Sequence, residues 1–80
     1  MTSKYTAQAG LALIKAAILE YLAEHQSGVR NAEITQALGL ESDFEGKQKN
    51  YLAWSILGLL VTEGTVRYEN VDGHPHYFEV

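Results

Sequence analysis

Four consecutive polar residues form the group best suited to contact nucleic acid. They are Lys47, Gln48, Lys49 and Asn50. A lysine ammonium pairs with phosphate, and the amide of glutamine or asparagine can donate to and accept from the major-groove edge of adenine. The group therefore predicts phosphate and base contacts rather than covalent chemistry.

The residues that follow add further candidate contacts. Tyr51 and Trp54 offer rings for stacking or backbone contacts, and Ser55 and Gly58 are small enough to permit close approach. At 100° per residue, Trp54 lies roughly 160° from the centre of the neighbouring apolar stripe, which favours an exposed ring over a core ring. Arg67 is expected to face outward as a phosphate contact, and His74 can touch phosphate when it is protonated.

No catalytic or metal-binding pattern accompanies these residues. The chain has no Cys, and its three histidines are His25, His74 and His76. The last two share a strand face, but the sequence supplies no third ligand. There is also no glycine-rich phosphate loop and no nucleophile paired with a base. We therefore expect no enzyme activity, no cofactor and no metal site.

Composition limits the other functional classes. Eighty residues suit one domain, residues 1–80, with 46% hydrophobic and 20% charged residues. Six Lys/Arg against ten Asp/Glu give a net charge of −4, so nucleic-acid contact must depend on local positive charge. The absence of Cys fits the reducing cytoplasm. The apolar run from Gly10 to Ile14 is interrupted by Lys15, and we expect no membrane-spanning segment.

Three helices are expected from the apolar periodicity. The first spans Ala7 to His25, the second spans Asn31 to Leu38 before Gly39, and the third runs from about Lys47 to Glu63 before Gly64. The first helix has an apolar stripe and an Ala-rich outer face. In the third, the expected buried stripe is Leu52, Ile56, Leu59 and Leu60, beside Ala53. The residues expected to be buried, of which no more than two should prove exposed, are Ile14, Ile18, Leu22, Ile34, Leu38, Leu52, Ile56, Leu60, Tyr68 and Phe78.

The segment from Thr65 to Val80 is rich in β-forming residues and has Asp72-Gly73 at its centre, which indicates a hairpin. A two-residue loop would pair Val66 with Glu79 and mix polar with apolar residues on each face. An odd-length loop would pair Val66 with Val80 and Tyr68 with Phe78, giving one apolar face. We therefore expect a three- or five-residue loop. A short strand at Gly28-Val29 can extend the sheet. Phe44 is expected to reach the core from the loop before the third helix.

The whole pattern resembles the winged helix-turn-helix superfamily. The resemblance lies in Glu33, Ile34, Leu38, Gly39 and Leu40 of the short second helix, and in Leu60, Glu63 and Gly64 directly before the hairpin. Residues 42–60 are also similar to winged-helix modules that accompany restriction–modification and phage proteins. The acidic loop from Glu41 to Gly46 is longer than the usual turn. The resemblance implies an α+β, mainly α fold, with three helices and a C-terminal β-hairpin wing.

Two functions follow from the resemblance and the residues together. The first is a DNA-binding module or small transcriptional regulator that reads double-stranded DNA with the third helix and the wing. The alternative is a winged-helix domain for protein–protein interaction, which the net charge of −4 favours. We also expect a homodimer, because the core of so short a chain is marginal and the Ala-rich outer face of the first helix permits close helix packing.

Overall fold

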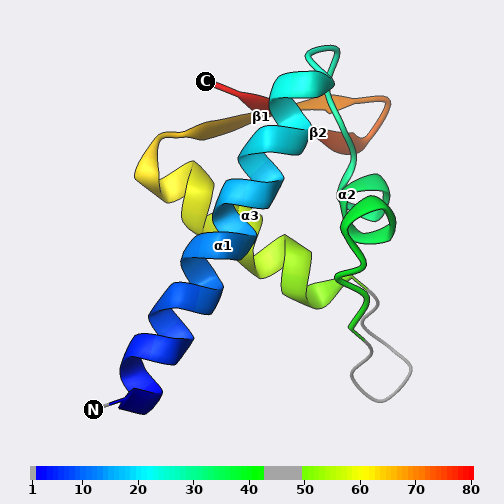
Figure 1. The fold of residues 1–80 in the computed structure, drawn as a ribbon. Coiled ribbons are helices and arrows are strands. Elements are labelled where there is room, and N and C mark those ends of the chain that lie inside the picture. Colours follow the sequence, from blue (N-terminus) through cyan, green and yellow to red (C-terminus); the bar gives the residue numbers. More distant parts are fainter. Residues whose placement is uncertain (1, 43–49) are drawn as a thin grey trace.

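The computed structural model describes residues 2–42 and 50–80, which form three helices followed by an antiparallel β-hairpin (Figure 1). The elements are α1 (Thr2–Glu24), α2 (Asn31–Leu38), α3 (Tyr51–Glu63), β1 (Val66–Val71) and β2 (His74–Glu79). This is the α+β, mainly helical layout expected from the sequence. Four residues for which we made predictions, Phe44, Lys47, Gln48 and Lys49, lie outside the described residues.

Helix α1 begins five residues earlier than expected, and its first half extends away from the rest of the molecule (Figure 1). Residues 2–9 are all exposed, whereas Ile18 and Leu22 near the other end are fully buried. By length and composition the helix could cross a membrane, and only 11% of its most apolar window is buried. Core helices of soluble proteins and signal sequences meet the same criterion, so the expectation of no membrane contact stays a prediction.

Helix α2 follows a short extended segment. Arg30 occupies its N-cap position without a side-chain hydrogen bond, and Gly39 ends it in the left-handed conformation. Val29, just before the helix, pairs with Tyr77 of β2 through two backbone hydrogen bonds of 3.0 and 2.8 Å. The expected third strand beside the hairpin is therefore present as a single bridge.

Helix α3 begins at Tyr51, so the expected start near Lys47 was wrong. Asn50 has a φ of 69°, which an α-helix cannot continue, and the hydroxyl of Ser42 accepts a hydrogen bond from the Leu52 N–H at 2.9 Å. The buried residues of α3 are Ala53, Ile56, Leu57 and Leu60. Leu52 and Leu59 are 38% and 45% exposed. Because α3 is apolar on most sides, its sequence does not identify the buried side, and in the fold the side that carries Leu57 packs against the core.

The hairpin has a two-residue loop, so the expected odd-length loop was wrong. Val66 pairs with Glu79 and Tyr68 pairs with Tyr77. Asp72 and Gly73 both have positive φ, 52° and 82°, the combination that matches the twist of a tight two-residue turn. The turn geometry set the register even though it leaves Tyr68 53% exposed.

The core lies where α1, α2, α3 and the hairpin meet. Of the ten residues expected to be buried, five are buried: Ile18, Leu22, Ile34, Ile56 and Leu60. Three more, Ile14, Leu38 and Phe78, are partly buried, and only Leu52 and Tyr68 are exposed. Leu52 is exposed because a different side of α3 faces the core than was expected. Tyr68 is exposed because the hairpin register differs from the expected one.

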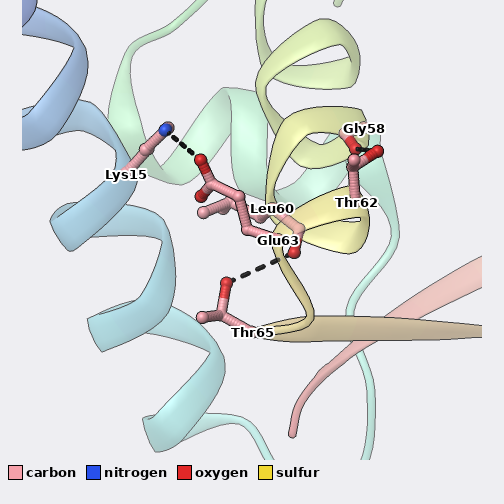
Figure 2. A network of polar contacts seen from close by, with 6 residues as sticks. All are labelled: Lys15, Gly58, Leu60, Thr62, Glu63 and Thr65. Atoms are coloured by element: carbon pink, nitrogen blue, oxygen red, sulfur yellow. Dashed lines mark hydrogen bonds and ion pairs between the residues drawn. The ribbon is translucent and has the colours of Figure 1, made fainter.

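A salt bridge fastens α1 to the end of α3. The ammonium of Lys15 lies 2.6 Å from a carboxylate oxygen of Glu63 (Figure 2). Nearby, the Thr65 hydroxyl donates to the Leu60 carbonyl at 3.3 Å, and the Thr62 hydroxyl donates to the Gly58 carbonyl at 3.0 Å (Figure 2). The ion pair thus joins α3 to α1, while the two hydroxyl contacts are local to the last turns of α3 and the residue that follows it.

Candidate nucleic-acid interface

One side of α3 is open to solvent and carries the aromatic residues that the sequence singled out. This exposed α3 face consists of Tyr51, Trp54, Ser55, Gly58 and Thr62, and each of these residues has another member of the group three or four positions away. Tyr51 and Trp54 are 51% and 57% exposed, and their ring centroids lie 6.1 Å apart. The structure therefore brings the predicted residues Tyr51, Trp54 and Ser55 to one face.

The exposed α3 face is electrically neutral. Between Tyr51 and Thr62 the helix has no charged residue, and Glu63 at its end is paired with Lys15. The Ser55 hydroxyl donates to the Leu52 carbonyl at 2.9 Å, which leaves the lone pairs of its oxygen free to accept from a ligand. A neutral surface neither attracts nor repels phosphate.

Asn50 joins α2 to the start of α3. Its carbonyl oxygen accepts hydrogen bonds from the Asn31 side-chain amide at 3.2 Å and from the Trp54 N–H at 3.0 Å. The backbone of Asn50 therefore has a structural role, while adenine recognition by its side chain stays a prediction. The other three members of the predicted polar group precede it outside the described residues.

Arg67 and His74 lie on the hairpin face opposite Tyr68. Side chains alternate along a strand, and the register places Arg67 beside Phe78. The Arg67 guanidinium lies 3.0 Å from a Glu69 carboxylate oxygen and 4.3 Å from the centre of the Phe78 ring. Arg67 is thus held in an exposed ion pair, and the Glu69 carboxylate weakens the attraction that Arg67 would exert on a phosphate.

His74 has a cationic neighbour from another part of the chain. The Arg30 guanidinium donates to Nδ1 of His74 at 3.2 Å, and both residues are exposed. An arginine guanidinium can only donate, so Nδ1 of His74 is the acceptor in this contact. Arg30, absent from our sequence-based prediction, is therefore the cation that accompanies His74.

A groove separates α3 from the other hairpin face. Its lining is Trp54, Gly58 and Val61 from α3 with Tyr68, Asn70, Pro75 and Tyr77 from the hairpin, and its volume is about 390 Å³. The rings of Tyr68 and Tyr77 lie 6.0 Å apart. Burial raises the pKa of the Tyr77 hydroxyl, and the neighbouring Tyr68 hydroxyl raises it further. All seven lining residues are therefore uncharged at neutral pH.

The hairpin residues of this groove were missed from sequence because the register was misjudged. Tyr68, Asn70 and Pro75 share one face only when Asp72 and Gly73 form a two-residue loop. The Asp-Gly pair was the available signal, since it favours that loop.

Two further observations complete the description. Within residues 2–42 and 50–80, no three His, Asp or Glu side chains are grouped as a metal site would require. Comparison with family models, curated proteins and solved structures finds no match.

Proposed function

We propose that this domain binds duplex DNA through the exposed α3 face and the polar segment that directly precedes it. The observation that carries the proposal is charge distribution. The chain contains ten acidic residues, yet none of them occurs between Tyr51 and Thr62. The helix can thus approach the phosphate-lined major groove without a carboxylate on its leading face.

The positions of α2 and α3 support this assignment. In helix-turn-helix proteins the first residues of the second helix contact base edges. The equivalent end of α3 carries Tyr51 and Trp54, and the Asn31–Asn50 hydrogen bond holds it against α2. The sequence supplies Lys47 and Lys49 within the four residues before Tyr51, which directly precede α3 in the chain.

The hairpin contributes less positive charge than its sequence suggests. The carboxylate of Glu69 offsets the positive charge of Arg67. Arg30, which precedes α2, places its own positive charge beside His74 near the turn of the hairpin. We therefore expect Lys47 and Lys49 to dominate the salt dependence, with a smaller contribution from Arg67.

The experiment is a fluorescence anisotropy titration of a labelled random-sequence duplex at two salt concentrations. Lys47→Ala and Lys49→Ala should each weaken binding and lower the slope of log affinity against log salt by about one. Lys4→Ala is the matched control, because Lys4 lies at the distant end of α1. Absence of binding by the wild-type protein at low salt would rule the proposal out.

A second function, protein–protein interaction, is favoured by the groove. Trp and Tyr residues often dominate the binding energy of protein interfaces, and here they line an uncharged groove on an acidic protein. In that case Tyr51→Ala and Trp54→Ala abolish a protein complex, while the lysine substitutions leave weak or absent DNA binding unchanged.

A further inference from the structure

Three aromatic side chains line the groove between α3 and the hairpin. Trp54 comes from α3, Tyr68 from β1 and Tyr77 from β2. Trp54 and Tyr68 are each more than half exposed, so both rings are accessible to a ligand, whereas Tyr77 is buried. The rings of Tyr68 and Tyr77 are inclined to each other by 44°. The tertiary structure thus brings rings from three elements to one hollow of the surface.

The chemistry of these rings favours a positively charged ligand. The face of an aromatic ring carries partial negative charge and attracts a cation that lies within about 6 Å of its centre. None of the seven described lining residues is a carboxylate, the partner that a metal ion or the N–H groups of an ammonium or guanidinium would favour. A quaternary ammonium has no N–H group and is the cation that cages of aromatic rings recognise. The groove therefore suits an alkylated ammonium better than a lysine, an arginine or a metal ion.

The charges next to the groove complement a cation. Because side chains alternate along a strand, Glu79 lies on the same face of β2 as Tyr77. Glu79 is exposed and forms no salt bridge within residues 2–42 and 50–80. Arg67 lies on the opposite face of the hairpin, where it pairs with Glu69. The groove face of the hairpin therefore has one acid and no base, its residues being Val66, Tyr68, Asn70, Pro75, Tyr77 and Glu79.

The size of the groove limits what it can hold. Its volume of about 390 Å³ is near the lower end of the range for small-molecule sites, roughly 300–1,000 Å³. A small alkylated head group suits this volume, whereas a large cofactor would exceed it. Asn70 adds a side-chain amide that can donate to or accept from the rest of the ligand.

We infer that this groove binds a trimethylated ammonium group against the rings of Trp54, Tyr68 and Tyr77. The inference does not rest on DNA binding, which was assigned to the exposed α3 face. Trp54 and Gly58 belong to both surfaces, so the variants that test the inference are made in the hairpin. Because two of the three rings are more than half exposed, we expect a dissociation constant in the high micromolar to low millimolar range.

The first test is a titration of the full chain with choline at constant ionic strength, followed by the fluorescence of Trp54, the one tryptophan of the sequence. The matched control is 3,3-dimethyl-1-butanol, which has the shape of choline but a neutral carbon in place of the charged nitrogen. We expect saturable binding of choline that is at least about tenfold tighter than binding of the alcohol. No saturable change with choline, or equal affinities for the two compounds, would overturn the inference.

The second test assigns the binding to the groove. Tyr68→Leu should weaken choline binding at least about fivefold, whereas Tyr68→Phe keeps the ring and should bind as the wild type does. Tyr51→Leu is the matched control, because Tyr51 is about as exposed as Tyr68 and its ring lies 6.1 Å from Trp54, yet it does not line the groove. Glu79→Gln should weaken binding of choline and leave binding of the alcohol unchanged. Equal effects of Tyr68→Leu and Tyr51→Leu would place the site elsewhere and overturn the inference.

The third test identifies the source of the ammonium group. Binding of Nα-acetyl-trimethyllysine amide that is tighter than binding of choline would place the group on a partner protein, and the reverse order would place it on a small molecule or a lipid head group. Both orders support the inference. Nα-acetyl-lysine amide, which lacks the methyl groups, should bind at least about fivefold more weakly than its trimethylated form. Equal affinity for the two lysine compounds would overturn the inference, because the site would then not select an alkylated cation.

Discussion

The side-chain amide of Asn31 donates a hydrogen bond to the backbone carbonyl of Asn50 across 3.2 Å. It thereby connects the first residue of α2 to the residue that precedes α3. The same Asn31 side chain accepts a 3.4 Å hydrogen bond from the hydroxyl of buried Thr35. One polar side chain thus links the two helices that form the candidate DNA-binding unit.

Asn31→Ala should lower the free energy of unfolding by about 1 kcal/mol, because a partly buried hydrogen bond is lost and the Thr35 hydroxyl loses its partner. Urea denaturation measures the change. Gln36→Ala, at an exposed position of the same helix, serves as the control and should change stability by less than about 0.5 kcal/mol. Equal effects of the two substitutions would contradict the linking role of Asn31.

Gly28→Ala should destabilise the domain by about 1–3 kcal/mol. Gly28 has a φ of 100°, and an added Cβ would lie 2.6 Å from the Phe78 ring. Gly10→Ala provides the opposite result as a control, since its Cβ would meet nothing within 4 Å. It should stabilise α1 by about 0.5–1 kcal/mol through higher helix propensity. Thermal unfolding of both variants measures these changes. A melting temperature of Gly28→Ala equal to that of the wild type would contradict the prediction.

Tyr77 should make the stability of the domain fall above pH 10. Burial raises the pKa of its hydroxyl in the folded state above the ordinary value of about 10, so the unfolded chain loses this proton first as the pH rises. The contribution of Tyr77 is fully present below pH 10 and is lost as the pH rises through the folded-state pKa.

Denaturation midpoints between pH 8 and 11 would measure this effect. Tyr77→Phe should flatten the decline, whereas Tyr5→Phe should leave it unchanged because Tyr5 is 75% exposed. An identical decline in the Tyr77→Phe variant would assign the pH dependence to other groups.

Gly58→Leu should separate binding from folding. Gly58 is exposed on α3 with open space around it, so the leucine fits and raises helix propensity. We expect equal or higher thermal stability and at least a tenfold loss of affinity for duplex DNA, because the side chain projects from the exposed α3 face. Thr2→Leu, on the exposed start of α1, is the control for added apolar surface. Unchanged DNA affinity in Gly58→Leu would place the interface elsewhere.

The number, order and type of the elements were predictable because they depend on local signals. Gly39 and Gly64 end helices with left-handed backbone, and the period through Ile18 and Leu22 identifies the buried side of α1. The solvent-exposed positions of Tyr51 and Trp54 also followed from spacing alone. The apolar spacing of the outer face of α1 is likewise visible in the sequence.

Tertiary structure decided what depends on contacts between distant residues. Because α3 is apolar on most sides, packing against α1, α2 and the hairpin determined that Leu57 is buried while Leu52 and Leu59 are exposed. The hairpin register followed the local Asp72-Gly73 turn, which outweighed the gain from one apolar face, and so brought Tyr68 beside Trp54 in the groove. Only the fold reveals that Glu63 forms a salt bridge with Lys15 and that the Ala-rich outer face of α1 is exposed to solvent. Both facts depend on where the elements lie in space.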